Sequence, residues 1–180
     1  MKRVTSVLAA AALALVVGAS SAQAQTLVVG VGGGAILPQG DLNDVAKLGY
    51  HGAAMAWYIL PSNLGFRADL IYARVPADKD ALGVSGNFKL MTGVANVSYM
   101  FKGSKTITPY VIGSLGYFSV KFEDSDSDNN VGFGGGAGVL INTGGKAKIA
   151  IEARYISIQS DPSKTNLIPV TAAIAFPLGK

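Results

Sequence analysis

The stretch LGFRADLIY, residues 64–72, alternates in character at every second position. Successive side chains of an extended chain point to opposite sides, so Arg67 and Asp69 share one face. The opposite face is entirely apolar and consists of Leu64, Phe66, Ala68, Leu70 and Tyr72. A strand with charges on one face and only apolar side chains on the other must separate two very different environments.

The same period of two recurs along the rest of the chain. In KIAIEARYI, residues 148–156, it places Glu152 and Arg154 opposite isoleucine, alanine and tyrosine, and in 87–101 it places Asn96 on the polar face. Each such segment is long enough to cross a bilayer as a tilted strand, which takes about 9–11 residues. The eight predicted strands are 27–37, 50–60, 64–75, 87–101, 108–122, 131–142, 148–158 and 167–176.

The connections between these segments alternate in length. Three are short turns rich in Pro, Gly, Ser and Asn, and four are longer and more polar. Short turns at one end and long loops at the other are typical of the periplasmic and extracellular ends of an outer-membrane barrel. The short turns are 61–63, 102–107 and 143–147; the long loops are 38–49, 76–86, 123–130 and 159–166.

The composition favours a membrane environment. Hydrophobic residues make up 49% of the chain and charged residues only 14%, against about 25% in ordinary soluble proteins. No segment after the N-terminal region is long and apolar enough for a spanning helix, which leaves a closed barrel as the membrane solution. We therefore predict an all-β, eight-stranded antiparallel up-and-down transmembrane β-barrel. A soluble sandwich or lipocalin-like barrel, with its apolar face inward, is the alternative.

Aromatic residues lie near both ends of the predicted strands, as expected for side chains at the two membrane interfaces. Trp57 and Tyr110 belong to the band at the short-turn end in this interpretation, and Phe118 belongs to the band at the long-loop end.

The N-terminus has the pattern of a secretory signal. A basic start, an apolar run over 7–17 and Ala22-Gln23-Ala24 predict a signal peptide, 1–24, followed by one barrel domain, 25–180, in the outer membrane. Without Lys2 and Arg3, 13 basic residues face 11 acidic ones, a net charge near +2 with no basic block, which argues against nucleic-acid binding. The absence of cysteine excludes disulfides and a lipid-modified cysteine.

These features, together with Pro109-Tyr110, Gly113 and Gly116-Tyr117 in the fifth strand, resemble the small outer-membrane β-barrel superfamily. It includes the transmembrane domain of outer membrane protein A, outer membrane protein X and the opacity-type surface proteins. The resemblance covers the whole mature chain and implies the same fold and location. The last residue of such barrels is usually aromatic and resembles the signal that the insertion machinery reads. Here residues 177–180 follow the aromatic residue Phe176.

The charges on the polar faces are the main candidate site. A charged side chain at the lipid midplane costs about 2–4 kcal/mol, so these residues should face the lumen, where buried charges need partners. An eight-stranded interior is just wide enough for side chains to fill. We predict an interior polar network that plugs the lumen, formed by Arg67, Asp69, Asn96, Glu152 and Arg154.

Other motifs have less specific interpretations. The glycine-rich segments 30–35 and 132–137 do not open helices, which argues against nucleotide binding. In the acidic run 123–130, Asp124, Asp126 and Asp128 form either a solvated loop or a weak cation site, without the spacing of an EF-hand. His51 is the only histidine, has no serine two residues away as in lipid A deacylases, and is placed at the barrel rim. We expect no metal and no cofactor.

The sequence thus predicts a non-catalytic, monomeric barrel with a closed, side-chain-filled lumen. Its loops would serve envelope structure or surface interaction and adhesion, and its only predicted partner is outer-membrane lipid, because no motif identifies an extracellular ligand. A narrow channel or transporter for small solutes is the alternative, and a lipid-modifying enzyme is the third possibility.

Overall fold

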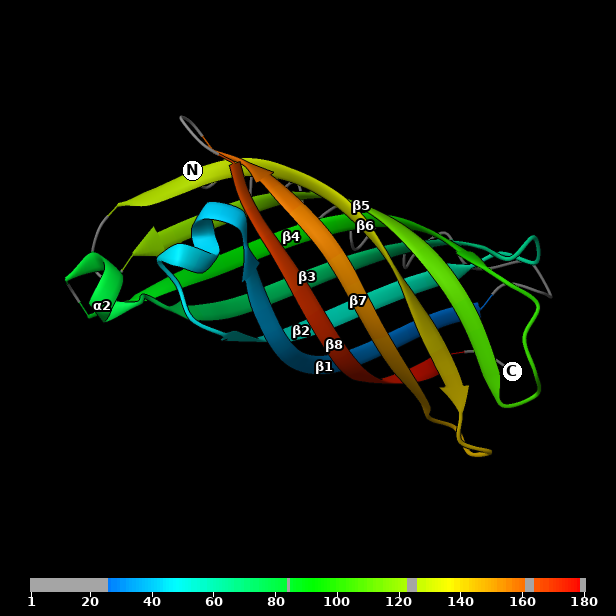
Figure 1. Ribbon diagram of the computed structural model, residues 1–180. Coiled ribbons are helices and arrows are strands. Elements are labelled where there is room, and N and C mark those ends of the chain that lie inside the picture. The colour runs from blue at the N-terminus through cyan, green and yellow to red at the C-terminus, as the bar shows by residue number, and fades with distance from the viewer. Residues whose placement is uncertain (1–25, 84, 123–125, 161–163, 179–180) are drawn as a thin grey trace.

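The computed structural model describes residues 26–178 except 84, 123–125 and 161–163, so the predicted signal peptide, 1–24, lies outside the described residues. Eight strands form a closed barrel in which each pairs antiparallel with its sequence neighbours and the first pairs with the last (Figure 1). The fold class predicted from the sequence is confirmed. The strands are β1 (Thr26–Gln39), β2 (Gly49–Ile59), β3 (Leu64–Pro76), β4 (Asn87–Met100), β5 (Ile107–Phe122), β6 (Ser127–Asn142), β7 (Lys148–Gln159) and β8 (Lys164–Leu178).

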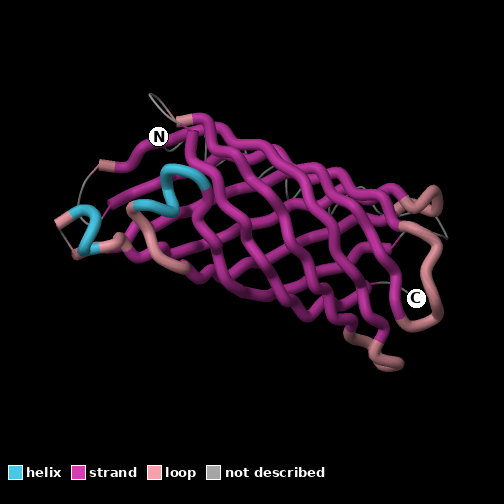
Figure 2. Tube along the Cα trace, in the orientation of Figure 1, coloured by secondary structure: helices cyan, strands magenta, loops and turns pink. Residues whose placement is uncertain are grey.

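The long-loop end differs from the expectation in detail. The loop 38–49 contains a 3-10 helix, η1 (Gly40–Asp44), and the loop 76–86 contains a short helix, α2 (Lys79–Leu82). Both helices lie at the same end of the barrel (Figure 2). The other two long loops are shorter than predicted. β6 begins at Ser127 and pairs with the end of β5, and β8 begins at Lys164, which pairs with Gln159 at the end of β7. Among the described residues, no helix is long and apolar enough to cross a membrane.

Side chains alternate between lipid and lumen as the sequence pattern predicts. Leu70 is 66% exposed on the outer wall, whereas Arg67 is 3% exposed inside. Ile151 and Glu152 show the same contrast between neighbouring positions of β7. A continuous apolar outer wall suits a bilayer and contradicts the alternative of a soluble barrel, in which that wall would face water.

The lumen is filled in three layers. The layer at the short-turn end is an apolar cluster that includes Trp57, Met100 and Leu140. A second apolar cluster, including Leu90 and Phe118, fills the long-loop end. The buried charged side chains lie between the two clusters, at mid-strand positions of β3 and β7.

Two aromatic residues expected at the membrane interface lie inside the barrel. Trp57 is 0% and Tyr110 is 1% exposed, and their rings meet edge to face with centroids 5.0 Å apart. Glycine on the neighbouring strand makes room for each ring: a Cβ at Gly65 would lie 2.3 Å from Trp57 Nε1, and one at Gly138 would lie 2.5 Å from Tyr110 Cζ. Phe118, 5% exposed, likewise fills the lumen rather than an aromatic band.

The inward position of Trp57 has a direct optical consequence. The protein contains one tryptophan, so tryptophan fluorescence reports on this ring alone. In bilayers of brominated phospholipid we expect little quenching, because Trp57 is screened from lipid by the barrel wall. The double variant Trp57→Phe with Phe66→Trp moves the only tryptophan to a position 44% exposed on the outer wall and should be strongly quenched. Equal quenching of the two proteins would contradict the inward orientation.

Candidate functional site

Four charged side chains from opposite walls meet in the middle of the lumen. Arg67 and Asp69 project from β3, while Glu152 and Arg154 project from β7. Arg67 binds Glu152 with both terminal nitrogens, from Nη1 to Oε2 and from Nη2 to Oε1, each at 2.9 Å. Paired donors on a planar guanidinium match the two oxygens of a carboxylate, which makes this a strong and directional contact across the barrel.

The remaining contacts connect every charge to both opposite charges. Arg154 Nη2 donates to Asp69 Oδ2 at 2.7 Å, and Arg154 Nε donates to Glu152 Oε1. Arg67 Nη2 donates to Asp69 Oδ2 at 3.1 Å, and Arg67 Nε lies 3.0 Å from Asp69 Oδ1 as an ion pair without hydrogen-bond geometry. Two guanidinium groups and two carboxylates therefore form a closed, electrically balanced cluster with side chains 1–8% exposed.

Polar residues of β4 and β5 complete the cluster. Asn96 Nδ2 donates to Asp69 Oδ2 at 3.1 Å, and Asn96 Oδ1 accepts from Arg154 Nη1 at 3.0 Å. Ser114 Oγ donates to the same Asn96 oxygen at 2.7 Å. Neutral side chains thus satisfy part of the hydrogen-bonding capacity left over by the ion pairs, as a buried charge cluster requires, while Arg67 Nε and Asp69 Oδ1 contact each other only as an ion pair. The structure brings together all five residues of the predicted interior network.

Three further members of this cluster were not predicted from the sequence. Tyr110 donates its hydroxyl to Glu152 Oε2 at 2.9 Å, and Trp57 lies below Arg67, whose guanidinium carbon is 5.1 Å from the ring centroid. Ser114 is the third. Tyr110 and Ser114 occupy the same face of β5, so the period of two could have identified them. An aromatic ring is compatible with either face, which is why the alternation did not assign Trp57.

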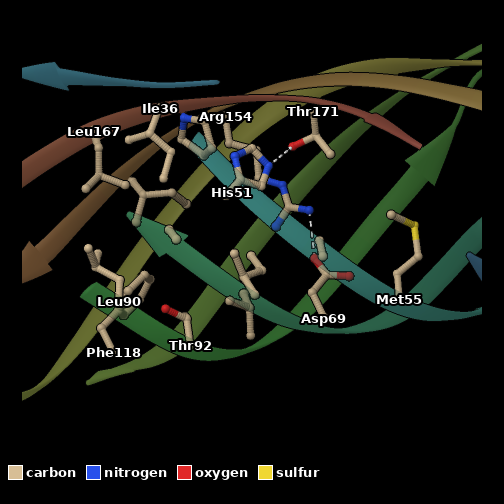
Figure 3. Close-up of a pocket in the computed structure, with 16 residues that line it drawn as sticks. Ile36, His51, Met55, Asp69, Leu90, Thr92, Phe118, Arg154, Leu167 and Thr171 are labelled. Carbon is tan, nitrogen blue, oxygen red and sulfur yellow. Dashed lines mark hydrogen bonds and ion pairs between the residues drawn. The ribbon is translucent and has the colours of Figure 1, made fainter. Parts of the chain in front are cut away.

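His51 lies inside the barrel, not at the rim as predicted from the sequence. It is 6% exposed, and its Nε2 lies 2.9 Å from the Thr171 hydroxyl on β8 (Figure 3). The reason is its register in β2, where it occupies the same inward-facing set of positions as Met55 and Trp57. Its Nδ1 has no hydrogen-bond partner among the described residues, so no carboxylate orients the ring as in a catalytic triad.

A small cavity lies between this histidine and the charge cluster. Its volume is about 40 Å³, and His51, Asp69, Thr92 and Arg154 are among its lining residues, together with apolar side chains (Figure 3). That volume holds roughly three water molecules and is too small for an organic substrate.

The two helix-containing loops, 38–49 and 76–86, cover the long-loop end next to the apolar cluster that includes Leu90 and Phe118. Ala46 pairs with Ala77, and backbone hydrogen bonds of 2.8 Å run from Lys47 N to Pro76 O and from Asp78 N to Val45 O. Both alanines are buried. Asp78 also accepts a hydrogen bond from the Asp80 backbone, which lowers the pKa of the Asp78 carboxyl, and it lies 3.4 Å from Lys47 Nζ. The two loops therefore form one cap on the barrel mouth.

The acidic run divides between loop and strand. Asp124 lies outside the described residues, Asp126 is in the loop, and Asp128 is in β6 opposite Val120. Within the described part of the chain, no three His, Asp or Glu side chains gather in a way that could hold a metal ion.

Comparisons with solved structures agree with this architecture. No curated protein matched the sequence. Among solved structures, Neisserial surface protein A superposes with a TM-score of 0.65 at 17% identity, covering 83% of this chain and 96% of that one. A major outer membrane protein from Thermus thermophilus gives 0.54 at 14% identity, covering 87% and 100%. The attachment invasion locus protein Ail of Yersinia pestis, in complex with the heparin analogue sucrose octasulfate, gives 0.51 at 18% identity, covering 84% and 97%.

At these identities the structural matches establish the fold alone. The family assignment comes from the sequence: a family model described as the outer membrane protein beta-barrel domain matches residues 9–176. This match spans nearly the whole chain and agrees with the closed eight-stranded barrel and its apolar outer wall. The protein is therefore a member of the outer membrane protein beta-barrel domain family and resides in the outer membrane.

Proposed function

We propose that this protein is a non-catalytic outer-membrane barrel with a closed lumen, and that its capped loop surface carries its function in surface interaction or envelope structure. The observation that carries the proposal is the charge cluster, in which Arg67 spans the lumen from β3 to bind Glu152 on β7 with two hydrogen bonds. A solute moving along the axis would have to separate this pair.

The layers above and below the charges support the same proposal. Apolar clusters of the described residues occupy both ends of the lumen, so an ion would have to cross an apolar layer to reach the ion pairs from either side. Desolvating an ion in those layers would be costly even if the charge cluster opened. A closed barrel also leaves no unpaired strand edge, which supports a monomer.

The cap supports a role for the loops. Its backbone hydrogen bonds and the bridge between Ala46 and Ala77 hold the two helix-containing loops in a defined arrangement. A preorganised surface loses less conformational entropy when it binds a partner than a flexible loop does. Ail, a protein of the same fold, is an attachment protein solved with a heparin analogue, which supports attachment as one form of this role.

The alternative is a narrow channel. The cavity beside His51 favours it, because about 40 Å³ of space already lies next to the charge cluster on its long-loop side. Rearrangement of the Arg154 side chain toward this space would be the first step in opening such a path.

Conductance across a planar bilayer separates these two functions. We expect no stepwise current from the wild-type protein in potassium chloride, because the lumen is blocked by paired charges and two apolar layers. The double variant Arg67→Ala with Glu152→Ala lacks the paired side chains. Its conductance is compared with that of the wild type to test whether this pair blocks the lumen. Regular conductance steps from the wild-type protein would favour the channel function instead.

The loop function needs a separate assay. A bacterium displaying the full protein should adhere to host cells or matrix glycans more than one displaying a variant in which residues 77–86 are replaced by a short turn. A matched substitution of the turn 143–147 at the other end should leave adherence unchanged. Equal adherence of all three would argue against the cap as the binding surface and would leave envelope structure as the role of the loops.

A further inference from the structure

The charges outside the lumen are distributed unequally between the two ends of the barrel. Four lysines lie at the short-turn end, at positions 102, 105, 146 and 148, and no described acidic residue accompanies them. Asp69 and Glu152 are inside the lumen, and every other described acidic residue lies at the long-loop end. Those residues are Asp41, Asp44, Asp78, Asp80, Asp126 and Asp128.

The four lysines form one cluster, because the two turns that carry them are adjacent. Lys102 and Lys105 belong to the connection between β4 and β5, while Lys146 and Lys148 lie at the connection between β6 and β7. β5 and β6 are neighbours in the sheet, and the Asn142 backbone N–H donates to the Thr106 carbonyl at 2.7 Å.

None of the four ammonium groups is neutralised within the described part of the chain, where the only ion pair outside the lumen is that of Lys47 with Asp78. The other half of the rim, formed by β8, β1, β2 and β3, has no charged residue among those described. The positive charge is therefore unbalanced and confined to one side.

The cluster lies at the edge of the lipid-facing wall. Lys102 follows Phe101, which is 46% exposed, and Lys148 precedes Ile149, which is 39% exposed. Lys105 is two residues from Ile107, which is 45% exposed. Lysines at this level can lay their methylene stems along the apolar wall and extend their ammonium groups to the depth of the lipid headgroups.

We propose that Lys102, Lys105, Lys146 and Lys148 bind the phosphate groups of anionic phospholipids in the leaflet at the short-turn end. Short turns face the periplasm in outer-membrane barrels, so this leaflet is the periplasmic one. Each lysine near an anionic membrane surface increases the association constant roughly fivefold. Phosphates at the barrel wall are the first anions that these side chains reach, whereas the carboxylates of the cell-wall polymer lie beyond the headgroups.

The test is lipid selectivity measured by electron spin resonance. The mature chain is reconstituted in phosphatidylcholine bilayers that contain phosphatidylglycerol, with trace spin-labelled forms of either lipid. We expect the motionally restricted shell of the wild type to favour spin-labelled phosphatidylglycerol several-fold at low salt, with most of the preference lost at about 1 M salt. Replacement of the four lysines by glutamine should remove most of this preference.

The matched control replaces four lysines of the long-loop end, Lys79, Lys89, Lys121 and Lys164, by glutamine. This control is needed because both ends meet the same lipid in a symmetric bilayer, and it should retain most of the selectivity. Heat-modifiable migration on a gel checks that each variant is folded. A short-turn variant that keeps the preference, or a control that loses as much, would overturn the proposal, as would a wild type without preference.

A second arm tests the cell-wall polymer. Wild type and variants are sedimented with isolated peptidoglycan sacculi. Sedimentation that depends on the four lysines, combined with unchanged lipid selectivity, would assign the cluster to the polymer and overturn the lipid proposal. This outcome is independent of conductance and adherence, so it leaves the proposed function of the lumen and loops untouched.

Discussion

Replacing Glu152 by alanine is expected to lower the free energy of unfolding by about 3–5 kcal/mol, the cost of stranding a buried charge. Glu152 accepts hydrogen bonds from Arg67, Arg154 and Tyr110 and is 5% exposed. Its removal leaves two guanidinium groups facing the single carboxylate of Asp69. The measurement is urea unfolding in lipid bilayers, read as a change in midpoint at constant m-value.

A double-mutant cycle shows whether the charges act as one cluster. Because Arg67 and Glu152 share two hydrogen bonds, the double alanine variant should be more stable than the sum of the two single losses predicts, with a coupling of about 0.5–3 kcal/mol. Asp128→Ala is the matched control, an exposed carboxylate whose loss should change stability by less than about 0.5 kcal/mol. Additive losses of stability would instead indicate a hydrated lumen and would favour the channel function.

Trp57→Ala is expected to destabilise the barrel by about 3–5 kcal/mol, the usual cost of removing a large buried aromatic side chain. Trp57 fills the layer directly below the charges, contacts the Tyr110 ring and donates from Nε1 to Ser98 Oγ at 3.0 Å. Removing it opens a cavity beneath Arg67, whose guanidinium packs over the indole ring. The same bilayer unfolding experiment measures the loss.

Two variants separate the sources of this effect. Trp57→Phe keeps an aromatic ring and removes the hydrogen bond to Ser98, so its loss should be clearly smaller than that of the alanine variant. Phe66→Ala, on the lipid-facing side of the adjacent strand, controls for the loss of an aromatic ring and should cost less than half as much, because lipid fills the space. A loss below about 1 kcal/mol for Trp57→Ala would show that the apolar layer at the short-turn end is not tightly packed.

Several features followed from the sequence by itself. Alternation such as that in β3, where Arg67 and Asp69 oppose Leu64, Phe66 and Leu70, depends only on the geometry of an extended chain and is visible in each segment separately. Turn composition and loop length are equally local. Strand number, pairing order and the inward orientation of the charges could therefore be predicted before any contact between distant residues was known.

Other features were decided by the closed barrel. Both guanidinium groups reach both carboxylates because closure brings β3 and β7 to opposite sides of a lumen narrow enough for long side chains to meet. Ser114 joins them only through its position relative to Asn96 on the neighbouring strand.

The aromatic side chains show the limit of the local pattern most clearly. Trp57 and Tyr110 are chemically suited both to a membrane interface and to a packed interior. Their inward orientation depends on Gly65 and Gly138, which provide space only because the strand register places each glycine against the ring. Local alternation along each strand is enough to assign the polar and the apolar faces. The three-dimensional register decided which large side chains fit inside, because packing depends on volumes contributed by residues far apart in the chain.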